Sequence, residues 1–289
     1  MKSLKLMIKL HGWVSTVPGL LITLGIALAV FSGCSNLQPV ADFGKNASVI
    51  AGNPDVAQDY PASLQRQKLY GQTDDSVSDK AIATRTHQAQ QLRDDQKILE
   101  AYARALGALA SNDLIDYNKQ IDALNSSLVN AKFATSTQTE GYASIAKLGL
   151  KLGTDIYRRH KLRSLITTYN RHIQKATRDL IAIVDNGYVR VGLNAEKTLL
   201  QDYVAAPAAQ STQKTEGLPE IINIVAAQQM EMLDKRKQNA EALVKGMQAF
   251  AKGHQELANN IGKVDFKVTL SLAQDYANQL RDILKSFRT

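Results

Sequence analysis

The chain has 289 residues, with 35 Lys and Arg against 27 Asp and Glu and a formal charge of +8. Hydrophobic residues make up 44% and charged residues 21%, a balance that excludes a disordered chain and a polytopic membrane protein. Only 6% of the residues are aromatic and six are Pro, which favours helices over a β-sandwich or barrel, and the single cysteine excludes an internal disulfide framework or a multi-cysteine metal site.

Residues 1–33 have the pattern of a secretory signal. Their first nine residues contain three lysines and no acidic residue. The apolar run at 20–31 has the length of a signal's hydrophobic region and is shorter than the ~20 residues that a membrane-spanning helix needs. The run closes on Phe-Ser-Gly-Cys at 31–34. The alternative interpretation is an uncleaved anchor helix in which the cysteine has no role.

This tetrapeptide resembles the lipobox of bacterial lipoproteins, which usually has Leu where Phe31 stands. The resemblance implies that Cys34 is diacylated on sulfur and becomes the new N-terminus, so that several acyl chains anchor the protein at ~0.8 kcal/mol for each buried CH₂. Ser35 follows the cysteine. Asp at that position commonly retains such lipoproteins in the inner membrane, so the resemblance implies an outer-membrane lipoprotein whose body faces the periplasm, with surface display as the alternative. Loss of three lysines with the signal leaves a charge of +5, which suits anionic lipid or glycan contacts and predicts no nucleic-acid partner.

Residues 34–76 are predicted to form an acylated N-terminus and a flexible tether. Six Pro and Gly residues interrupt this segment among Asn, Asp, Gln and Ser. Pro and Gly at this density prevent long helices or strands and leave at most one short helix near residues 56–60. The alternative is a loop packed onto the body through Leu64, Leu69 and Tyr70.

Residues 77–289 are predicted to form an all-α domain, because only Pro207 and Pro219 interrupt them. Expected helices cover about 78–110, 113–131, 139–153, 154–205, 218–262 and 265–287. Their apolar residues recur in alternating steps of three and four, most clearly in the helix at 218–262, and this period is typical of coiled-coil-like packing. Asp185-Asn186-Gly187 predicts a kink in the fourth helix, and 205–217 a loop. Short connections predict an elongated up-and-down bundle and allow one long hairpin to project.

The apolar positions that recur along each helix form a seam that faces the neighbouring helices. Polar residues replace aliphatic ones at several of these seam positions, including Gln96, Gln229, Arg236 and His254. A charge at the position of Arg236 needs a partner or the end of the bundle. We expect His254 to be a hydrogen-bonded structural residue rather than a pH sensor. Polar seams suit a bundle that completes its packing with another chain, and they equally suit a bundle of marginal stability.

Two basic surfaces are candidate binding sites for a membrane or a protein partner. One is a cluster near residue 160, which could dock phosphate-bearing lipid or an acidic partner and is otherwise a solvated helix face. The other is the segment 141–157, whose two lysines lie on one face of an amphipathic helix that could lie on a membrane, or could be a core helix of the bundle itself. The candidate residues are Lys147, Lys151, Arg158, Arg159, Lys161 and Arg163.

Motifs of catalysis and metal binding are missing from the sequence. None of the mature histidines follows an acidic residue by three positions, as a di-iron bundle requires. The sequence also lacks a zinc-protease motif, a phosphate-binding loop, a dinucleotide fingerprint and a nucleophile elbow. We therefore expect no enzyme, no cofactor and no metal, and a lipid-anchored scaffold with an envelope protein partner or a second copy. The alternatives are a membrane-perturbing or pore-forming helical protein and a helical ligand-binding or sensory domain.

Overall fold

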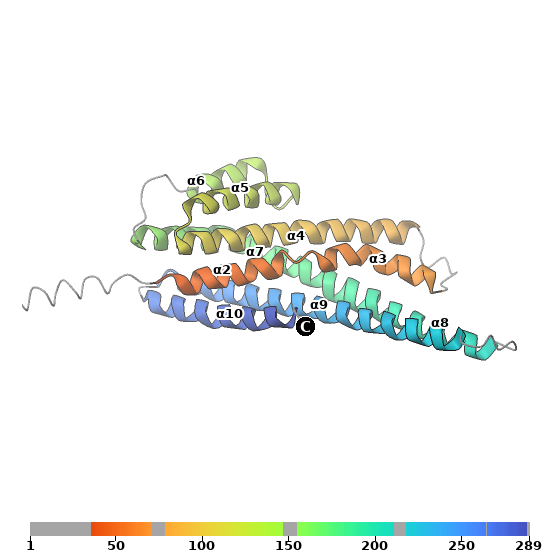
Figure 1. Cartoon of the computed structure of the whole chain (residues 1–289). Helices are drawn as coiled ribbons and strands as arrows, with labels where there is room; N and C mark the ends of the chain where they lie inside the picture. Colours follow the sequence, from red (N-terminus) through yellow and green to blue (C-terminus); the bar gives the residue numbers. More distant parts are fainter. Residues whose placement is uncertain (1–35, 71–78, 147–154, 211–217, 264, 288–289) are drawn as a thin grey trace, which may run out of the picture. The chain divides into compact units, whose positions relative to one another are not determined.

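The computed structural model in Figure 1 describes residues 36–70, 79–146, 155–210, 218–263 and 265–287. The chain divides into two units between Asn36 and Leu37, and the fold described here is that of the second unit. Every element within the described residues is helical, which confirms the predicted all-α class. The elements are α2 (Gln38–Ala51), α3 (Asp55–Leu69), α4 (Asp79–Ser111), α5 (Leu114–Asn130), α6 (Ser136–Ala146), α7 (Asp155–Ala182), a π-helix (Ile183–Leu193), α8 (Asn194–Gln210), α9 (Leu218–Asn260) and α10 (Phe266–Ser286).

The helices pack directly on one another without a sheet among the described residues. Helix α2 packs against α4, α9 and α10, and α7 lies between α4 and α9. The hairpin of α5 and α6 covers α4 and α7, and α3 contacts α4, the π-helix, α8 and α9. The predicted seams of the four long helices form the core, with residues such as Leu92, Leu99, Leu106, Leu165, Ile173, Leu180, Leu243, Phe250 and Leu257 fully buried.

The tether predicted over residues 34–76 is wrong for residues 38–69, which form α2, a short turn and α3; residues 34–35 and 71–76 lie outside the described residues. Pro39 lies in the first turn of α2 and Pro54 immediately precedes α3, and at both positions the missing N–H would have no partner within the helix. Phe43, Ile50 and Tyr60 are almost completely buried. These residues are therefore part of the core, and the compact unit begins at Leu37.

Gly44 shows why a residue that resembles a helix breaker is needed inside α2. A Cβ atom at Gly44 would lie 2.6 Å from the carbonyl oxygen of Ala103 and 2.6 Å from the backbone nitrogen of Gly107. The backbones of α2 and α4 therefore approach so closely that only glycine fits.

The predicted kink near Gly187 is a π-helix, and the chain remains helical from Asp155 to Gln210. Val191 would lie on the apolar face if the α-helical period continued, but it is 59% exposed, because i→i+5 hydrogen bonds change which side chains face the core. The loop expected at 205–217 begins later, since α8 continues through Pro207. The end of the helix expected at 139–153 lies outside the described residues. Asp113 and Asp265 cap α5 and α10, accepting hydrogen bonds from the backbone N–H groups of Asp116 and Lys267, and both helices begin where the sequence predicts.

Candidate functional site

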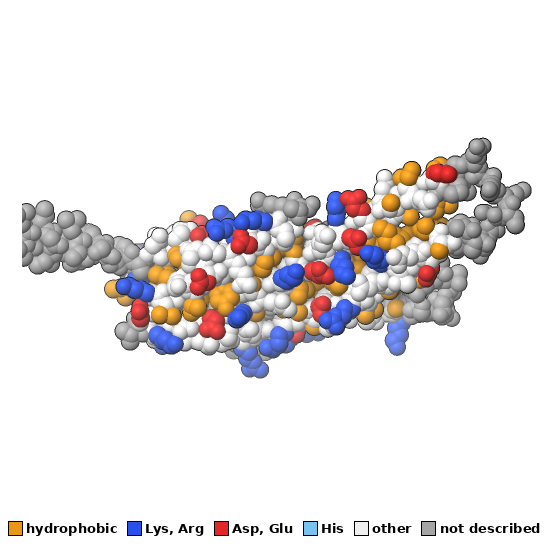
Figure 2. All heavy atoms as spheres, turned by 90° about the horizontal axis from the view of Figure 1, so that it is seen from below, with side chains coloured by type: hydrophobic (Ala, Val, Ile, Leu, Met, Phe, Trp, Pro, Cys, Tyr) orange, Lys and Arg blue, Asp and Glu red, His pale blue; other side chains and the backbone are white. Residues whose placement is uncertain are grey.

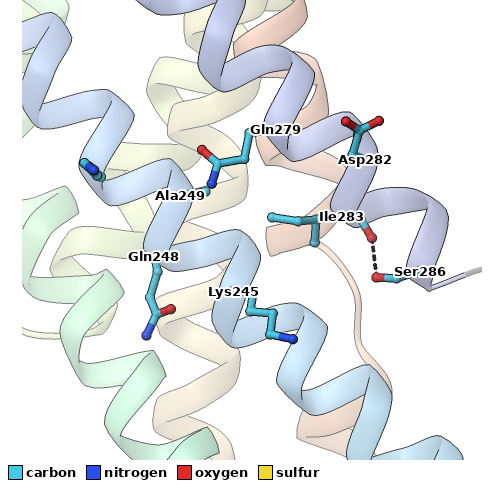
Figure 3. Close-up of a pocket in the computed structure, with 8 residues that line it drawn as sticks. Lys245, Gln248, Ala249, Gln279, Asp282, Ile283 and Ser286 are labelled. Atoms are coloured by element: carbon cyan, nitrogen blue, oxygen red, sulfur yellow. Dashed lines mark hydrogen bonds between the residues drawn. The ribbon is translucent and has the colours of Figure 1, made fainter.

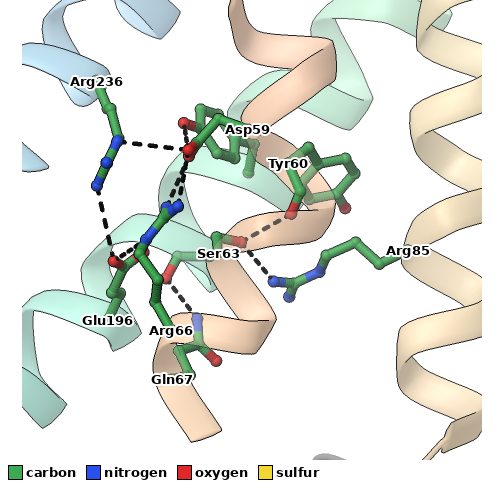
Figure 4. Close-up of polar contacts among 10 residues, drawn as sticks. Asp59, Tyr60, Ser63, Arg66, Gln67, Arg85, Glu196 and Arg236 are labelled. Atoms are coloured by element: carbon green, nitrogen blue, oxygen red, sulfur yellow. Dashed lines mark hydrogen bonds and ion pairs between the residues drawn. The ribbon is translucent and has the colours of Figure 1, made fainter. Parts of the chain in front are cut away.

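A cluster of two acids and two arginines joins α3, α8 and α9 (Figure 4). Arg66 donates to Asp59 at 2.8 and 2.7 Å and binds Glu196 through Nε and Nη2, the latter at 3.0 Å. The side chain of Glu196 is fully buried. Arg236 reaches the cluster from α9, with its Nε 3.4 Å from Asp59. The sequence prediction that Arg236 needs a partner is confirmed.

Burial and the neighbouring guanidinium groups together set the pKa of each acid in the cluster. Burial favours a raised pKa for Asp59, but hydrogen bonds from Arg66 and Tyr188 together with the charges of Arg66 and Arg236 lower its pKa below the ordinary value. Burial raises the pKa of Glu196 despite its bonds to Arg66. The pKa of Arg66 is raised, because both acids outweigh the effect of its burial. Two positive and two negative side chains thus neutralise one another.

The π-helix supplies further bonds to the same cluster. The hydroxyl of Tyr188 donates to Asp59 at 2.6 Å, and Gln67 donates to the carbonyl oxygen of Gly192 at 2.8 Å. Gly187 lies against the hydroxyl of Tyr60, where any Cβ atom would collide. These contacts hold the irregular segment against α3, so we call Asp59, Arg66, Tyr188, Glu196 and Arg236 the ionic clasp.

A polar pocket of about 380 Å³ adjoins the ionic clasp. Its lining includes Asp59, Tyr188 and Arg236, together with Gln58 and Asn239. Asp59 and Arg236 in its wall are already paired with each other, and the remaining charged residue of the lining, Asp55, is exposed at the start of α3.

A second polar network lies in the core between α4, α7 and α9. The hydroxyl of Tyr102 and Nε2 of His254 are 2.5 Å apart, and Nδ1 of His254 is 3.0 Å from Asn170 Oδ1. Complete burial lowers the pKa of His254 to about 3, so the ring is neutral at physiological pH. His254 is a hydrogen-bonded core residue, as its seam position predicts.

A polar groove of about 560 Å³ lies between α9 and α10 (Figure 3). Lys245, Gln248 and Lys252 line it from α9, and Gln279 and Asp282 from α10. Long polar side chains of this kind surround a solvated groove and do not present a buried reactive group.

The predicted basic cluster gathers at the first turns of α7. Arg158 donates to the carbonyl oxygen of Ala110 at 3.1 Å, and the guanidinium of Arg159 lies 4.9 Å from the ring centre of Phe266. Lys161 lies over the ring of Tyr157, and Arg163 is exposed. The other candidates, Lys147, Lys151 and Cys34, lie outside the described residues.

Sequence reasoning missed the ionic clasp because it assigned Asp59 and Arg66 to a tether. The one signal that pointed to it was the seam position of Arg236. Within the described ranges, no group of three or more His, Cys, Asp or Glu could hold a metal ion, and no helix there is long and apolar enough to cross a membrane. Comparison of the chain with protein-family models, with curated proteins and with solved structures found no match.

Proposed function

We propose that the protein is a lipid-anchored, non-enzymatic scaffold of the bacterial cell envelope, acylated at Cys34 and held in the outer membrane with its body in the periplasm. The observation that carries the interaction role is a set of exposed hydrophobic side chains on α8 and on the first four turns of α9. We call Tyr203, Ile221, Ile224, Val225 and Met232 the hairpin patch; their exposed fractions run from 39 to 60%.

The hairpin patch has the spacing of a helix-binding surface. Ile221, Ile224, Val225 and Met232 recur along one side of α9 in steps that a partner helix can match. Figure 2 shows hydrophobic side chains gathering at the end of the molecule formed by α8 and the start of α9. Exposed hydrophobic residues that lie in a group on a protein surface mark interaction sites, because the free energy falls when a partner covers them. The proposed partner is a helical segment of another envelope protein.

Site-specific photocrosslinking in intact cells tests this role. A photoreactive amino acid at Ile224 should capture one reproducible envelope protein, and the product should disappear when Ile221→Glu is added. Val49 is the matched control, because it is 52% exposed but lies on α2. A product that forms equally from Val49, or that survives Ile221→Glu, would contradict a partner site on the hairpin patch.

The proposed anchor has its own test. Cys34→Ala should remove the acyl mass from the protein and release the body from the outer-membrane fraction, while the helical content stays unchanged. If a soluble periplasmic form captured the same partner and supported the same cellular phenotype, membrane tethering would not be part of the function.

A further inference from the structure

The bundle has one end, near Leu37, at which α2, α5, α7 and α10 begin and α4 and α9 end. Helix α2 begins there and runs antiparallel to α4, because Gly44 lies against Gly107 whereas Gly52, further along α2, lies against Glu100, earlier in α4. The bond from Arg158 to Ala110 places the start of α7 beside the end of α4. Arg159 lies over Phe266, which places the start of α10 at the same level. The start of α5 follows the end of α4 directly. We call this the anchor end; it lies opposite the tip of the α8–α9 hairpin (Figure 1).

Three exposed hydrophobic side chains lie at the anchor end, on three different helices. Ile115 of α5 is 86% exposed, Ile156 of α7 is 81% exposed and Val268 of α10 is 45% exposed. Ile115 and Ile156 are the most exposed large hydrophobic residues described. None of the three belongs to the core formed by the described residues.

The anchor end is also basic. Its cationic side chains come from α7, from the segment between α9 and α10 and from the first turn of α10, and they are Arg158, Arg159, Lys161, Arg163, Lys263 and Lys267. The acids with described side chains at this level include Asp42, Asp113, Asp116, Glu256 and Asp265, of which Asp113 and Asp265 cap helices. Basic side chains around exposed aliphatic ones form the pattern that binds the interface of an anionic bilayer.

The covalent chain places a membrane anchor beside this end. Three peptide units separate Cys34 from Leu37, so their Cα atoms lie no more than about 10 Å apart. An acyl chain on Cys34 would therefore hold the anchor end, and not the hairpin tip, against the bilayer. An uncleaved hydrophobic segment at 20–31 would attach the protein at the same end.

We propose that the anchor end docks on the anionic phospholipid headgroups of the leaflet that holds the anchor, with Ile115, Ile156 and Val268 entering the interfacial layer. This inference rests on the proposed membrane anchor and adds the orientation of the body. Helix α9 rises ~1.5 Å per residue, so Ile224 lies about 55 Å along α9 from Asn260. The docked protein presents the hairpin patch on the side away from the membrane.

Tryptophan quenching in the full-length protein tests the orientation. Ile156→Trp and Ile224→Trp place a fluorophore at either end. Trp13, the chain's only native tryptophan, lies in the segment that the proposed cleavage removes, so each processed variant carries one tryptophan; if the segment is retained, Trp13 gives the same background in both. Each variant is reconstituted into vesicles of phosphatidylcholine and brominated phosphatidylglycerol. We expect a blue shift and strong quenching at position 156 and neither change at position 224.

Charge reversal separates headgroup binding from simple proximity. Arg163→Glu with Lys267→Glu should abolish the quenching at position 156, whereas the matched change Lys68→Glu with Lys235→Glu at the other end should leave it intact. Circular dichroism of each variant shows that the helices are retained. Equal quenching at both reporter positions, or quenching that survives the first charge reversal, overturns the proposal.

The mass of the intact protein distinguishes failure of this inference from failure of the proposed function. If the protein is acylated and floats with vesicles but is not quenched at position 156, the lipid anchor is present and the anchor end does not dock on the membrane. A protein without acyl mass that is still quenched there docks by its basic end, and the lipoprotein assignment fails instead. A protein that neither carries acyl chains nor floats refutes both.

Discussion

Asp95 is buried in α4 on the side that faces α7, and its ionisation should weaken the fold. Asp95 is 1% exposed, and neither of its carboxylate oxygens has a hydrogen-bond partner within the part of the chain that the structure describes. Burial raises its pKa from 3.8 to about 8; the negative charge of Asp179 adds to this effect and Lys175 opposes it. Asp95 is therefore protonated in the folded protein at neutral pH and ionised in the unfolded chain.

The pH dependence follows from this difference. Below pH 3.8 the carboxyl is protonated in both states and its contribution to stability is fully present. As the pH rises toward 8, the unfolded chain loses this proton and the folded protein keeps it, so the free energy of unfolding falls by about 1.4 kcal/mol per pH unit. At pH 7 the accumulated loss is about 4 kcal/mol, a large part of the 5–15 kcal/mol typical of a folded domain.

Asp95→Asn removes the titration and keeps the shape of the side chain. We expect the variant and the parent to unfold alike in urea near pH 4, and the variant to be more stable by about 4 kcal/mol at pH 7. Circular dichroism across a pH series measures the difference, and Asp94→Asn, on the adjacent and partly exposed residue, is the control. A stability difference that is the same at pH 4 and pH 7 would refute the reasoning.

The remaining predictions concern glycine packing and the ionic clasp. Gly44→Ala should destabilise the protein by about 1–3 kcal/mol because α2 must move off α4, whereas Gly141→Ala, which meets no atom within 4 Å, should stabilise it by up to about 1 kcal/mol; equal effects in thermal melts would contradict the close approach. Arg66→Met should cost about 3–5 kcal/mol because the buried Glu196 would keep only its 3.9 Å contact with Arg236. Tyr188→Phe should cost only about 1–3 kcal/mol for one lost hydrogen bond to a carboxylate; urea titrations that rank these two variants in the opposite order would show that the clasp does not hold the π-helix.

Periodicity predicted those parts of the fold that depend on local pattern. Leu92, Leu99 and Leu106 recur every seven residues and are all fully buried, because a helix presents such positions on one face. Asp113 and Asp265 cap helices by bonds to residues two or three positions ahead, and these bonds depend only on neighbouring residues.

The candidate site depended on contacts that no local pattern contains. Arg66 and Glu196 are 130 positions apart, and a sequence shows at most that Arg236 lacks a place on an apolar seam. Gly44 and Pro39 have the composition of a linker, but the close approach of α4 gives the glycine a use and the first turn of α2 tolerates the proline.

The sequence by itself therefore determined the helical class, the main seams and the signal-like first 33 residues, because these follow from spacing along the chain. Only the tertiary structure decided that α2 and α3 belong to the core, that the ionic clasp neutralises itself, and that Ile115, Ile156 and the basic start of α7 share one end. Burial and charge pairing between distant segments set these features, since the free energy of a polar or apolar side chain depends on what surrounds it in space.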